Sequence, residues 1–259
     1  MTGGTEGIPA VHLTGATMLA LVSAIPELEL RTGGPVTVVG GLAVLCRLGT
    51  AYRVTSDLDT VHRRAAGELS MLEVVMRTLG AEEAGPAGAI IPTPEGKVRV
   101  DIIEVTDSEL QRLPDDPTDR LAVLSHAWAA SSATHVKVRV ARPSGPPVTE
   151  VVVLMAEPGP LIAMKLQSIM NRPTNKERTD LLDIVRLTLD PRTGPAGLAQ
   201  LSNADDQLAA DAALHAQRWF IDLKRQTSRL INGIPEGTDV DDDTIDLVAE
   251  LLLTELARS

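Results

Sequence analysis

The chain has 259 residues, of which 44% are hydrophobic, and its formal net charge at pH 7 is −11. This length is sufficient for one large or two modest domains with buried cores. The sequence contains no apolar run of about 18 residues, and its first residues lack a basic segment followed by an apolar stretch. We therefore expect no membrane-spanning helix and no secretory signal. The single cysteine, Cys46, forms no internal disulfide and fits a reducing cytoplasm.

The negative charge argues against an extensive nucleic-acid surface, because phosphate contacts normally dominate such binding. The excess is local, however, since residues 236–259 hold eight acidic residues against one arginine, whereas residues 163–186 concentrate lysine and arginine. With two tryptophans, one tyrosine and one phenylalanine, the chain offers no platform on which splayed bases could stack. An RNA ligand would therefore have to bind through its shape and its phosphates.

In chain order, the first half mixes helices and strands. The pattern predicts a helix over 12–26, a strand over 36–39, a helix over 42–48 and a strand over 53–61. It then predicts an amphipathic helix over 68–79, a loop or hairpin over 80–96, and strands over 98–105, 135–141 and 148–155. Cys46 lies inside the second helix, where we expect it to be a small buried hydrophobic residue.

After the Glu157–Pro160 turn the pattern is wholly helical, with helices predicted over 161–171, 176–189, 204–230 and 241–256. We therefore predict an α/β (α+β) fold with a mixed sheet and a helical C-terminal half. The expected domains are residues 1–157 and residues 158–259.

A glycine pair and two aspartates frame the first candidate site. Gly40 and Gly41 follow a short β-branched strand and would let the backbone approach a polyphosphate at a helix N-terminus. Asp57 and Asp59 lie two residues apart on a strand, so their side chains project from one face. Two carboxylates on one rigid strand suit Mg²⁺, which is bound by carboxylates together with substrate phosphates. Alone, each half is more often a plain turn or an exposed strand end.

Asp101 is a candidate third carboxylate, because it lies in a later strand with Val100 and Ile102 on the opposite face. A charge in an apolar strand is costly to bury unless it is paired or bound to a metal. The alternative is a solvated aspartate on an edge strand. Glu104 would point away from Asp101, so only one of the two can join the site and Glu104 should tolerate substitution.

The second candidate block covers residues 161–187. Lys165 lies among apolar residues of the first helix, where it must snorkel to the surface or find an anion. Asp180 and Asp183 lie one helical turn apart on the following helix and share a face. Ion pairs between neighbouring helical turns would account for Arg178 and Arg186, but they account less well for a lysine that has no obvious partner.

These blocks resemble those of DNA polymerase β-type nucleotidyltransferases, and specifically those of the AbiEii/MenT-like toxins of toxin–antitoxin systems. That family shows Gly-Gly, a short helix and Arg-x-Ser/Thr-x-Asp-x-Asp, matched here by Arg53, Thr55, Asp57 and Asp59. It also shows a lysine about ten residues before a Lys/Arg-x-x-x-Asp-x-x-Asp helix, matched by Lys165, Lys176, Asp180 and Asp183. The resemblance covers residues 36–187.

The resemblance implies a cytoplasmic, Mg²⁺- or Mn²⁺-dependent enzyme that transfers a nucleoside monophosphate from an NTP to an RNA, with the tRNA 3′ end as acceptor. Such transfer would block aminoacylation, and a cognate antitoxin would be the protein partner. The implied catalytic residues are Asp57, Asp59, Lys165 and Asp180, and the implied metal ligands are Asp57, Asp59 and Asp101. The implied nucleotide-binding residues are Gly40, Gly41, Arg53, Ser56 and Lys165.

Two other functions remain open. A small-molecule nucleotidyltransferase of the aminoglycoside-modifying type would use the same chemistry, and an acidic surface suits a cationic acceptor. A non-catalytic interaction protein on the same fold is the alternative from a different class. No Gly-x-Ser-x-Gly, Gly-x-Gly-x-x-Gly or Gly-Lys-Ser/Thr motif is present, which argues against a hydrolase, a Rossmann domain and a P-loop NTPase.

Overall fold

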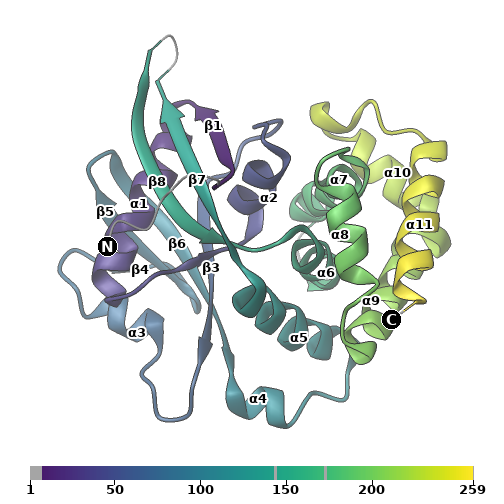
Figure 1. Ribbon diagram of the computed structural model, residues 1–259, viewed down its shortest axis with the longest axis horizontal. Helices are drawn as coiled ribbons and strands as arrows, with labels where there is room; N and C mark the ends of the chain where they lie inside the picture. Colours follow the sequence, from purple (N-terminus) through teal and green to yellow (C-terminus); the bar gives the residue numbers. More distant parts are fainter. Residues whose placement is uncertain (1–7, 143–144, 172–173, 259) are drawn as a thin grey trace. The chain divides into compact units, whose positions relative to one another are not determined.

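The computed structural model describes residues 8–142, 145–171 and 174–258 and divides into two units (Figure 1). The first unit runs through Thr106 and includes Ala130–Ala156, and the second comprises Asp107–Ala129 and the chain from Glu157 onward. The sequence placed a single boundary at residue 157, whereas here residues 107–129 group with the C-terminal helices. Helix α5 (Pro117–Ser132) carries the chain from the second unit back to the first.

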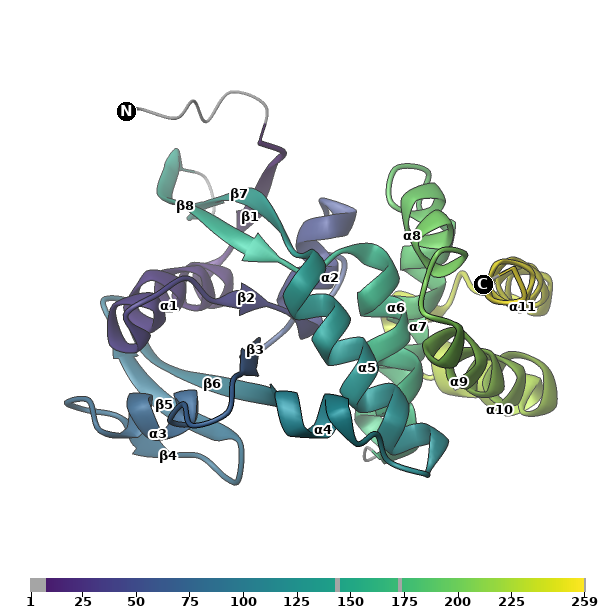
Figure 2. The same cartoon turned by 60° about the horizontal axis from the view of Figure 1, so that its bottom comes forward.

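The first unit is built on an eight-stranded mixed sheet with the strand order β1-β7-β8-β2-β3-β6-β5-β4. Its strands are β1 (Ala10–Thr14), β2 (Thr37–Val38), β3 (Asp57–Arg64), β4 (Glu82–Glu83), β5 (Gly88–Thr93), β6 (Gly96–Thr106), β7 (Thr134–Ala141) and β8 (Pro147–Met155). Its helices are α1 (Ala16–Thr32), α2 (Gly40–Leu48) and α3 (Met71–Met76). Helix α1 packs against β5, β6, β7 and β8, as Figures 1 and 2 show.

The alternation of side chains along β6 shows how this sheet is held. Val98, Val100 and Ile102 are buried, whereas Arg99 is exposed and Asp101 is half-buried. Successive residues of a strand point to opposite faces, so one face of β6 joins the core and the other carries its charged residues. The prediction that Val100 and Ile102 oppose Asp101 is therefore confirmed.

The second unit is helical (Figure 2). Besides most of α5, it contains α4 (Asp107–Gln111), α6 (Pro158–Ser168), α7 (Thr174–Leu189), α8 (Gly194–Leu201), α9 (Asp206–Ala216), α10 (Lys224–Asn232) and α11 (Asp242–Leu256). A π-helical turn, Gln217–Asp222, separates α9 from α10, and 3₁₀ turns occupy Ile169–Asn171 and Pro235–Gly237. The mixed α/β class and the helical C-terminal part are confirmed.

The N-terminal segment differs from its prediction. The sequence favoured one helix over 12–26, but residues 10–14 form β1, which pairs in parallel with β7. Gly15, at φ 109°, then separates this strand from α1. Val11 and Leu13 of this strand are buried, and the long-range pairing overrides the local helical pattern.

Cys46 lies in α2 and is buried, as predicted. Burial raises the pKa of its thiol to about 12, an effect that the charge of Arg47 partly offsets. The thiol is therefore protonated and unreactive at neutral pH. None of the helices in the described part of the chain is both long and apolar enough to span a bilayer.

Candidate active site

Two neighbouring strands inside the sheet, β3 and β6, carry the acidic residues that the sequence singled out. Strands β3 and β6 are parallel, with Asp57 opposite Arg99 and Asp59 opposite Asp101. The residues between them, Leu58 and Val100, are fully buried. Because side chains alternate along both strands, the three aspartates and Arg99 project from the same face. We call these four residues the acidic array.

The N-terminus of α2 lies directly against this array. Gly40 has φ +63°, and a Cβ atom built on it would lie 2.6 Å from the Asp59 Cγ atom. A Cβ atom on Gly41 would lie 2.6 Å from the Thr55 hydroxyl and 3.1 Å from the Arg53 Nη2 atom. Only glycine allows both the backbone conformation at Gly40 and so close an approach. The two glycines therefore bring the start of a helix against Asp59 and the loop that precedes β3.

That loop carries two of the expected nucleotide-binding residues. The Ser56 hydroxyl donates a hydrogen bond to the Asp57 carboxylate at 3.1 Å. The Arg53 guanidinium donates to the Val54 carbonyl at 3.1 Å and lies 5.9 Å from the centre of the Tyr52 ring. Arg53 and Ser56 thus lie on the same short loop as Thr55, beside Gly41 and Asp57 respectively.

Asp101 is paired with a residue of its own strand. The Arg99 Nε atom donates to the Asp101 Oδ1 atom at 3.0 Å, and the Arg99 Nη2 atom lies 2.9 Å from the same oxygen. The pKa of Arg99 is raised, first by this hydrogen bond and by the charge of Asp101, and further by the charges of Asp57 and Asp59. Arg99 therefore sits within the field of all three carboxylates.

The acidic array has the donor chemistry of a Mg²⁺ site, since carboxylate oxygens are the ligands this ion prefers. The glycine backbone at α2 leaves room beside Asp59 that a Cβ atom would fill. In the part of the chain that the structure describes, no group of three or more His, Cys, Asp or Glu side chains is arranged to hold a metal ion. Asp57, Asp59 and Asp101 as ligands thus remain a prediction.

Lys165, in the second unit, has two carboxylate partners. Lys165 is buried in α6, and its ammonium pairs with Asp180 and, at 2.8 Å, with the Asp183 Oδ2 atom. The Ser168 hydroxyl donates to the other Asp180 oxygen at 2.9 Å. Of the two outcomes left open for Lys165, the structure shows that it finds anions and does not snorkel to the surface. The reason is tertiary, because α7 packs on α6 and turns its Asp-x-x-Asp face to the lysine.

Asp183 was not among the expected site residues, yet it is fully buried and contacts Lys165. The spacing of three residues between Asp180 and Asp183 was the signal for it, since residues so spaced share a helix face. We call Lys165, Asp180, Asp183 and Ser168 the lysine cluster.

Arg186 has a structural pairing, but the partner lies far along the chain, whereas the sequence suggested ion pairs between neighbouring helical turns. It donates two hydrogen bonds to Asp239, at 2.9 and 2.6 Å, and one to the Glu236 carbonyl at 2.9 Å. These contacts tie α7 to the chain before α11, and the hydrogen bond from Arg186 lowers the pKa of Asp239.

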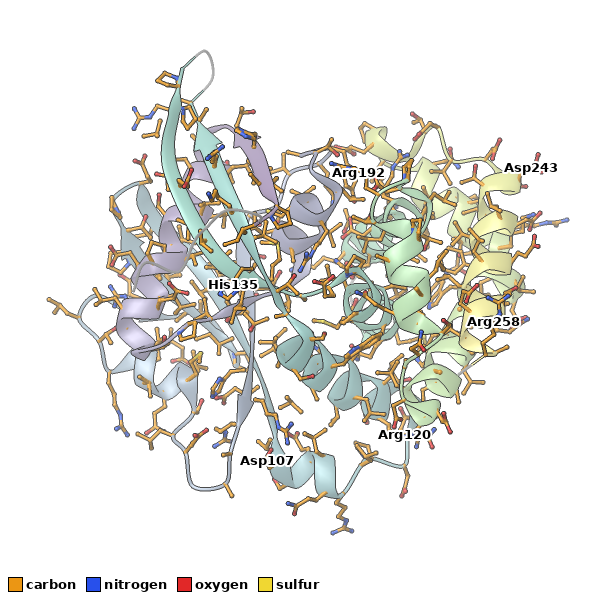
Figure 3. The ribbon with its side chains drawn as sticks, viewed as in Figure 1. Asp107, Arg120, His135, Arg192, Asp243 and Arg258 are labelled. Carbon is orange, nitrogen blue, oxygen red and sulfur yellow. The ribbon has the colours of Figure 1, made fainter. Side chains whose placement is uncertain are left out.

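A second buried ionic contact in the helical unit was not foreseen. Arg120, labelled in Figure 3, donates from Nε and Nη2 to the two Asp211 oxygens, each at 2.7 Å. The imidazole of His215 contacts the Asp211 carbonyl at 2.7 Å and the Thr118 hydroxyl at 3.2 Å. These contacts join α5 to α9, and no local pattern in either helix marks them.

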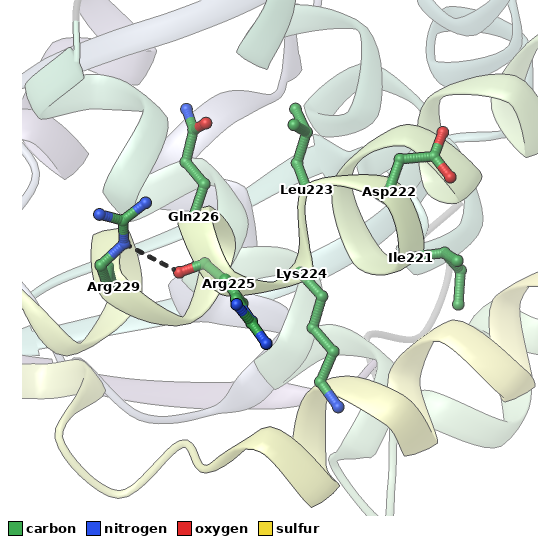
Figure 4. Close-up of a pocket in the computed structure, with 7 residues that line it drawn as sticks. All are labelled: Ile221, Asp222, Leu223, Lys224, Arg225, Gln226 and Arg229. Carbon is green, nitrogen blue, oxygen red and sulfur yellow. Dashed lines mark hydrogen bonds between the residues drawn. The ribbon is translucent and has the colours of Figure 1, made fainter.

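A surface hollow of about 440 Å³ lies at the start of α10 (Figure 4). It is lined by Ile221, Asp222, Leu223, Lys224, Arg225, Gln226 and Arg229. The Arg229 Nε atom donates to the Arg225 carbonyl at 3.1 Å, and Lys224 pairs with Asp246 at 2.6 Å. The hollow mixes charges of both signs and contains none of the expected site residues.

Comparison with known proteins gives one result of note. No family model matches the chain, and no curated protein matches it. A solved structure, that of an antigenic nucleotidyltransferase-like protein from Paracoccidioides brasiliensis, is similar to it with 18% sequence identity and a TM-score of 0.41. The match covers 77% of this chain and 94% of that chain.

Proposed function

We propose that this protein is a nucleotidyltransferase of the polymerase β type that transfers a nucleoside monophosphate from an NTP to a hydroxyl group. The observation that carries the proposal is the acidic array, with Asp57, Asp59 and Asp101 on one face of two parallel strands. The start of α2 against Asp59 supports it, since backbone N–H groups at a helix N-terminus bind phosphate.

In this proposal each part of the first unit has a task. Asp57, Asp59 and Asp101 would hold Mg²⁺ or Mn²⁺, which would orient the triphosphate and neutralise charge on the transferred group. Gly40 and Gly41 keep the α2 backbone open to the phosphates, and Arg53 adds a cation beside them. The Ser56 hydroxyl holds the Asp57 carboxylate in place.

Lys165 and Asp180 are proposed as further essential residues on the strength of the family resemblance. Their direct contact in the lysine cluster supports a role of Asp180 in holding the lysine, and Asp183 shares that role. An ammonium fixed in this way loses little entropy when it meets an anion.

The proposed acceptor is the 3′ end of tRNA, and the proposed biological role is that of an AbiEii/MenT-like toxin restrained by a cognate antitoxin. The test is incubation of the protein with each α-labelled NTP, Mg²⁺ and total tRNA, followed by gel analysis. Label should enter tRNA with one or a few of the NTPs and should not do so with Asp57→Ala. If no NTP labels any RNA, the proposed acceptor is wrong.

A small-molecule acceptor is the second candidate, and the net charge of −11 favours it because cationic acceptors prefer carboxylate-lined sites. Parallel reactions with an aminoglycoside in place of tRNA, analysed by mass spectrometry for a nucleotidyl adduct, separate the two. Absence of transfer to either acceptor, together with absence of NTP binding, would favour the non-catalytic alternative.

A further inference from the structure

Arg99 occupies a position that the proposed chemistry does not use. It is the fourth corner of the acidic array, opposite Asp57 across the strand pair and two residues before Asp101 on β6. Its guanidinium reaches along the strand to the Asp101 carboxylate rather than away from the array. A cation is thus built into the face on which three carboxylates are gathered.

The physical reason for a cation here is the repulsion among the aspartates. Neighbouring strands of a sheet lie about 4.8 Å apart, and like charges directly opposite one another are destabilising. Asp59 and Asp101 form such a pair. One guanidinium that contacts Asp101 and acts on Asp57 and Asp59 through its charge relieves part of this repulsion.

The ion pair between Arg99 and Asp101 has features of a weak, separable contact. The Arg99 Nε and Nη2 atoms both contact one oxygen, Asp101 Oδ1. They do not form the two parallel hydrogen bonds, one to each oxygen, that make arginine–carboxylate pairs strong. The Arg99 side chain is 46% exposed, and exposed pairs contribute at most about 1 kcal/mol. On β5, a Cβ atom at Gly88 would lie 2.7 Å from the same oxygen and 3.2 Å from Arg99 Nη2, so the absence of a side chain there makes room for the pair.

We infer that Arg99 is a displaceable counter-cation of the acidic array, which holds Asp101 until a divalent cation takes that carboxylate. The guanidinium and the divalent ion would thus act on the same carboxylate, and the positive charge of Arg99 opposes binding of the ion. This inference rests on the proposed function in one respect, namely that Asp57, Asp59 and Asp101 bind a divalent cation.

The test measures Mn²⁺ binding to the nucleotide-free protein by titration calorimetry. Arg99→Gln removes the competing charge and should tighten Mn²⁺ binding about two- to tenfold. Arg99→Lys keeps the charge and should bind Mn²⁺ nearly as the native protein does. The rise in melting temperature at a fixed Mn²⁺ concentration should be larger for Arg99→Gln than for the native protein, because tighter binding stabilises the folded state more.

A matched control is Arg139→Gln on β7, since Arg139 is also a partly exposed arginine paired with one carboxylate, Glu150, at 2.5 Å. It should leave Mn²⁺ affinity unchanged. Asp57→Asn should weaken Mn²⁺ binding strongly. If it does, but Arg99→Gln leaves the affinity unchanged or weakens it, the role of Arg99 is overturned while the metal site stands. If Asp57→Asn binds Mn²⁺ as the native protein does, the metal site itself is refuted and the inference falls with it.

Discussion

The acidic array and the lysine cluster each combine carboxylates with one cation, but they differ in exposure. In the array, Arg99 is 46% exposed and Asp101 is 20% exposed, whereas in the cluster Lys165 is 8% exposed and Asp183 is fully buried. Exposed pairs are screened by water and exchange partners easily, while buried charges are held to the partners they have. The array is therefore suited to take up an external cation, and the lysine cluster is suited to keep its own ammonium in place.

The largest expected effect is on activity and comes from the array. Asp57→Ala and Asp59→Ala should each lower nucleotidyl transfer by about 10³-fold or more, because metal-assisted charge stabilisation contributes several kcal/mol. The melting temperature should change little, since each substitution also relieves repulsion among the aspartates. The measurement is transfer of label from NTP alongside thermal melting.

Asp243→Ala, on the exposed start of α11 (Figure 3), is the matched control and should keep full activity. Substantial residual transfer by either array variant, at an unchanged melting temperature, would remove the metal-site interpretation.

The largest expected effect on stability comes from the lysine cluster. Lys165→Met leaves Asp180 and Asp183 buried without the ammonium they contact, which should lower the free energy of unfolding by about 3–5 kcal/mol. Replacing all three residues, with Lys165→Met, Asp180→Asn and Asp183→Asn, should recover much of this loss because no buried charge is then left over. Urea denaturation of the two variants measures the difference.

The triple variant also separates stability from catalysis. If Lys165 and Asp180 are essential, the triple variant stays inactive although it is folded. Recovery of transfer together with recovery of stability would show that the cluster is structural, and an unchanged midpoint for Lys165→Met would contradict its burial altogether.

The sequence predicted most strands because the alternation of apolar and polar residues is local and strong. It missed β1, since a five-residue strand gains its stability from pairing with β7, far along the chain. It also missed α5, which carries a weak amphipathic pattern, and α8, which is only eight residues long. The grouping of residues 107–129 with the C-terminal helices likewise depends on distant packing.

In the candidate site, too, some features follow from local sequence patterns and others depend on long-range packing. The shared face of Asp57 and Asp59 follows from the two-residue period of a strand, and the sequence was sufficient for it. Arg99 and Asp101 share a face of β6 for the same reason, so the sequence also indicates their pairing. The burial of Asp183 on Lys165 depends on helix packing, which no local pattern encodes. Charge partners supplied by another element are therefore the part of the site that the sequence predicts least well.

Substitutions of Gly40 and of Gly33 together test how closely α2 must approach the array. Gly40 and Gly33 both have positive φ, at +63° and +74°, but a Cβ atom meets Asp59 only at Gly40, while nothing lies within 4 Å of one at Gly33. Gly33→Ala should cost about 1–2 kcal/mol from the left-handed backbone alone. Gly40→Ala should cost more and also lower transfer, because Asp59 must move. Equal losses in stability and no loss of transfer would mean that the close approach has no role.

A smaller effect is expected at Glu104, where tolerance to substitution stays a prediction for activity while its contacts imply a cost in stability. Its carboxylate accepts the Met71 N–H at 2.7 Å at the start of α3 and lies 3.8 Å from the Arg64 Nε atom. Glu104→Ala should cost about 1 kcal/mol, as the loss of a helix cap does. Glu104→Gln keeps an acceptor and should cost less. Both variants should keep full nucleotidyl transfer when assayed at a temperature well below their melting temperatures. A loss of activity under these conditions would place Glu104 in the site.

The smallest expected effect is at Arg186, and it completes the contrast between exposed and buried ionic contacts. Arg186 binds Asp239 through two hydrogen bonds, as strong a geometry as any in the lysine cluster, but the Asp239 side chain is 62% exposed. Arg186→Ala should therefore lower the free energy of unfolding by at most about 1 kcal/mol.

The pH dependence of this effect follows from the pKa of Asp239, which the hydrogen bond from Arg186 lowers in the folded protein. The pair therefore contributes to the free energy of unfolding above the ordinary aspartate pKa of about 3.9, and this contribution is lost as the pH falls through the lowered value. In the variant, an NMR titration should find the Asp239 pKa raised towards its ordinary value, and the stability difference should shrink in acid and in high salt. A loss near that of Lys165→Met at neutral pH would mean that geometry, rather than burial, decides the strength of ionic contacts in this protein.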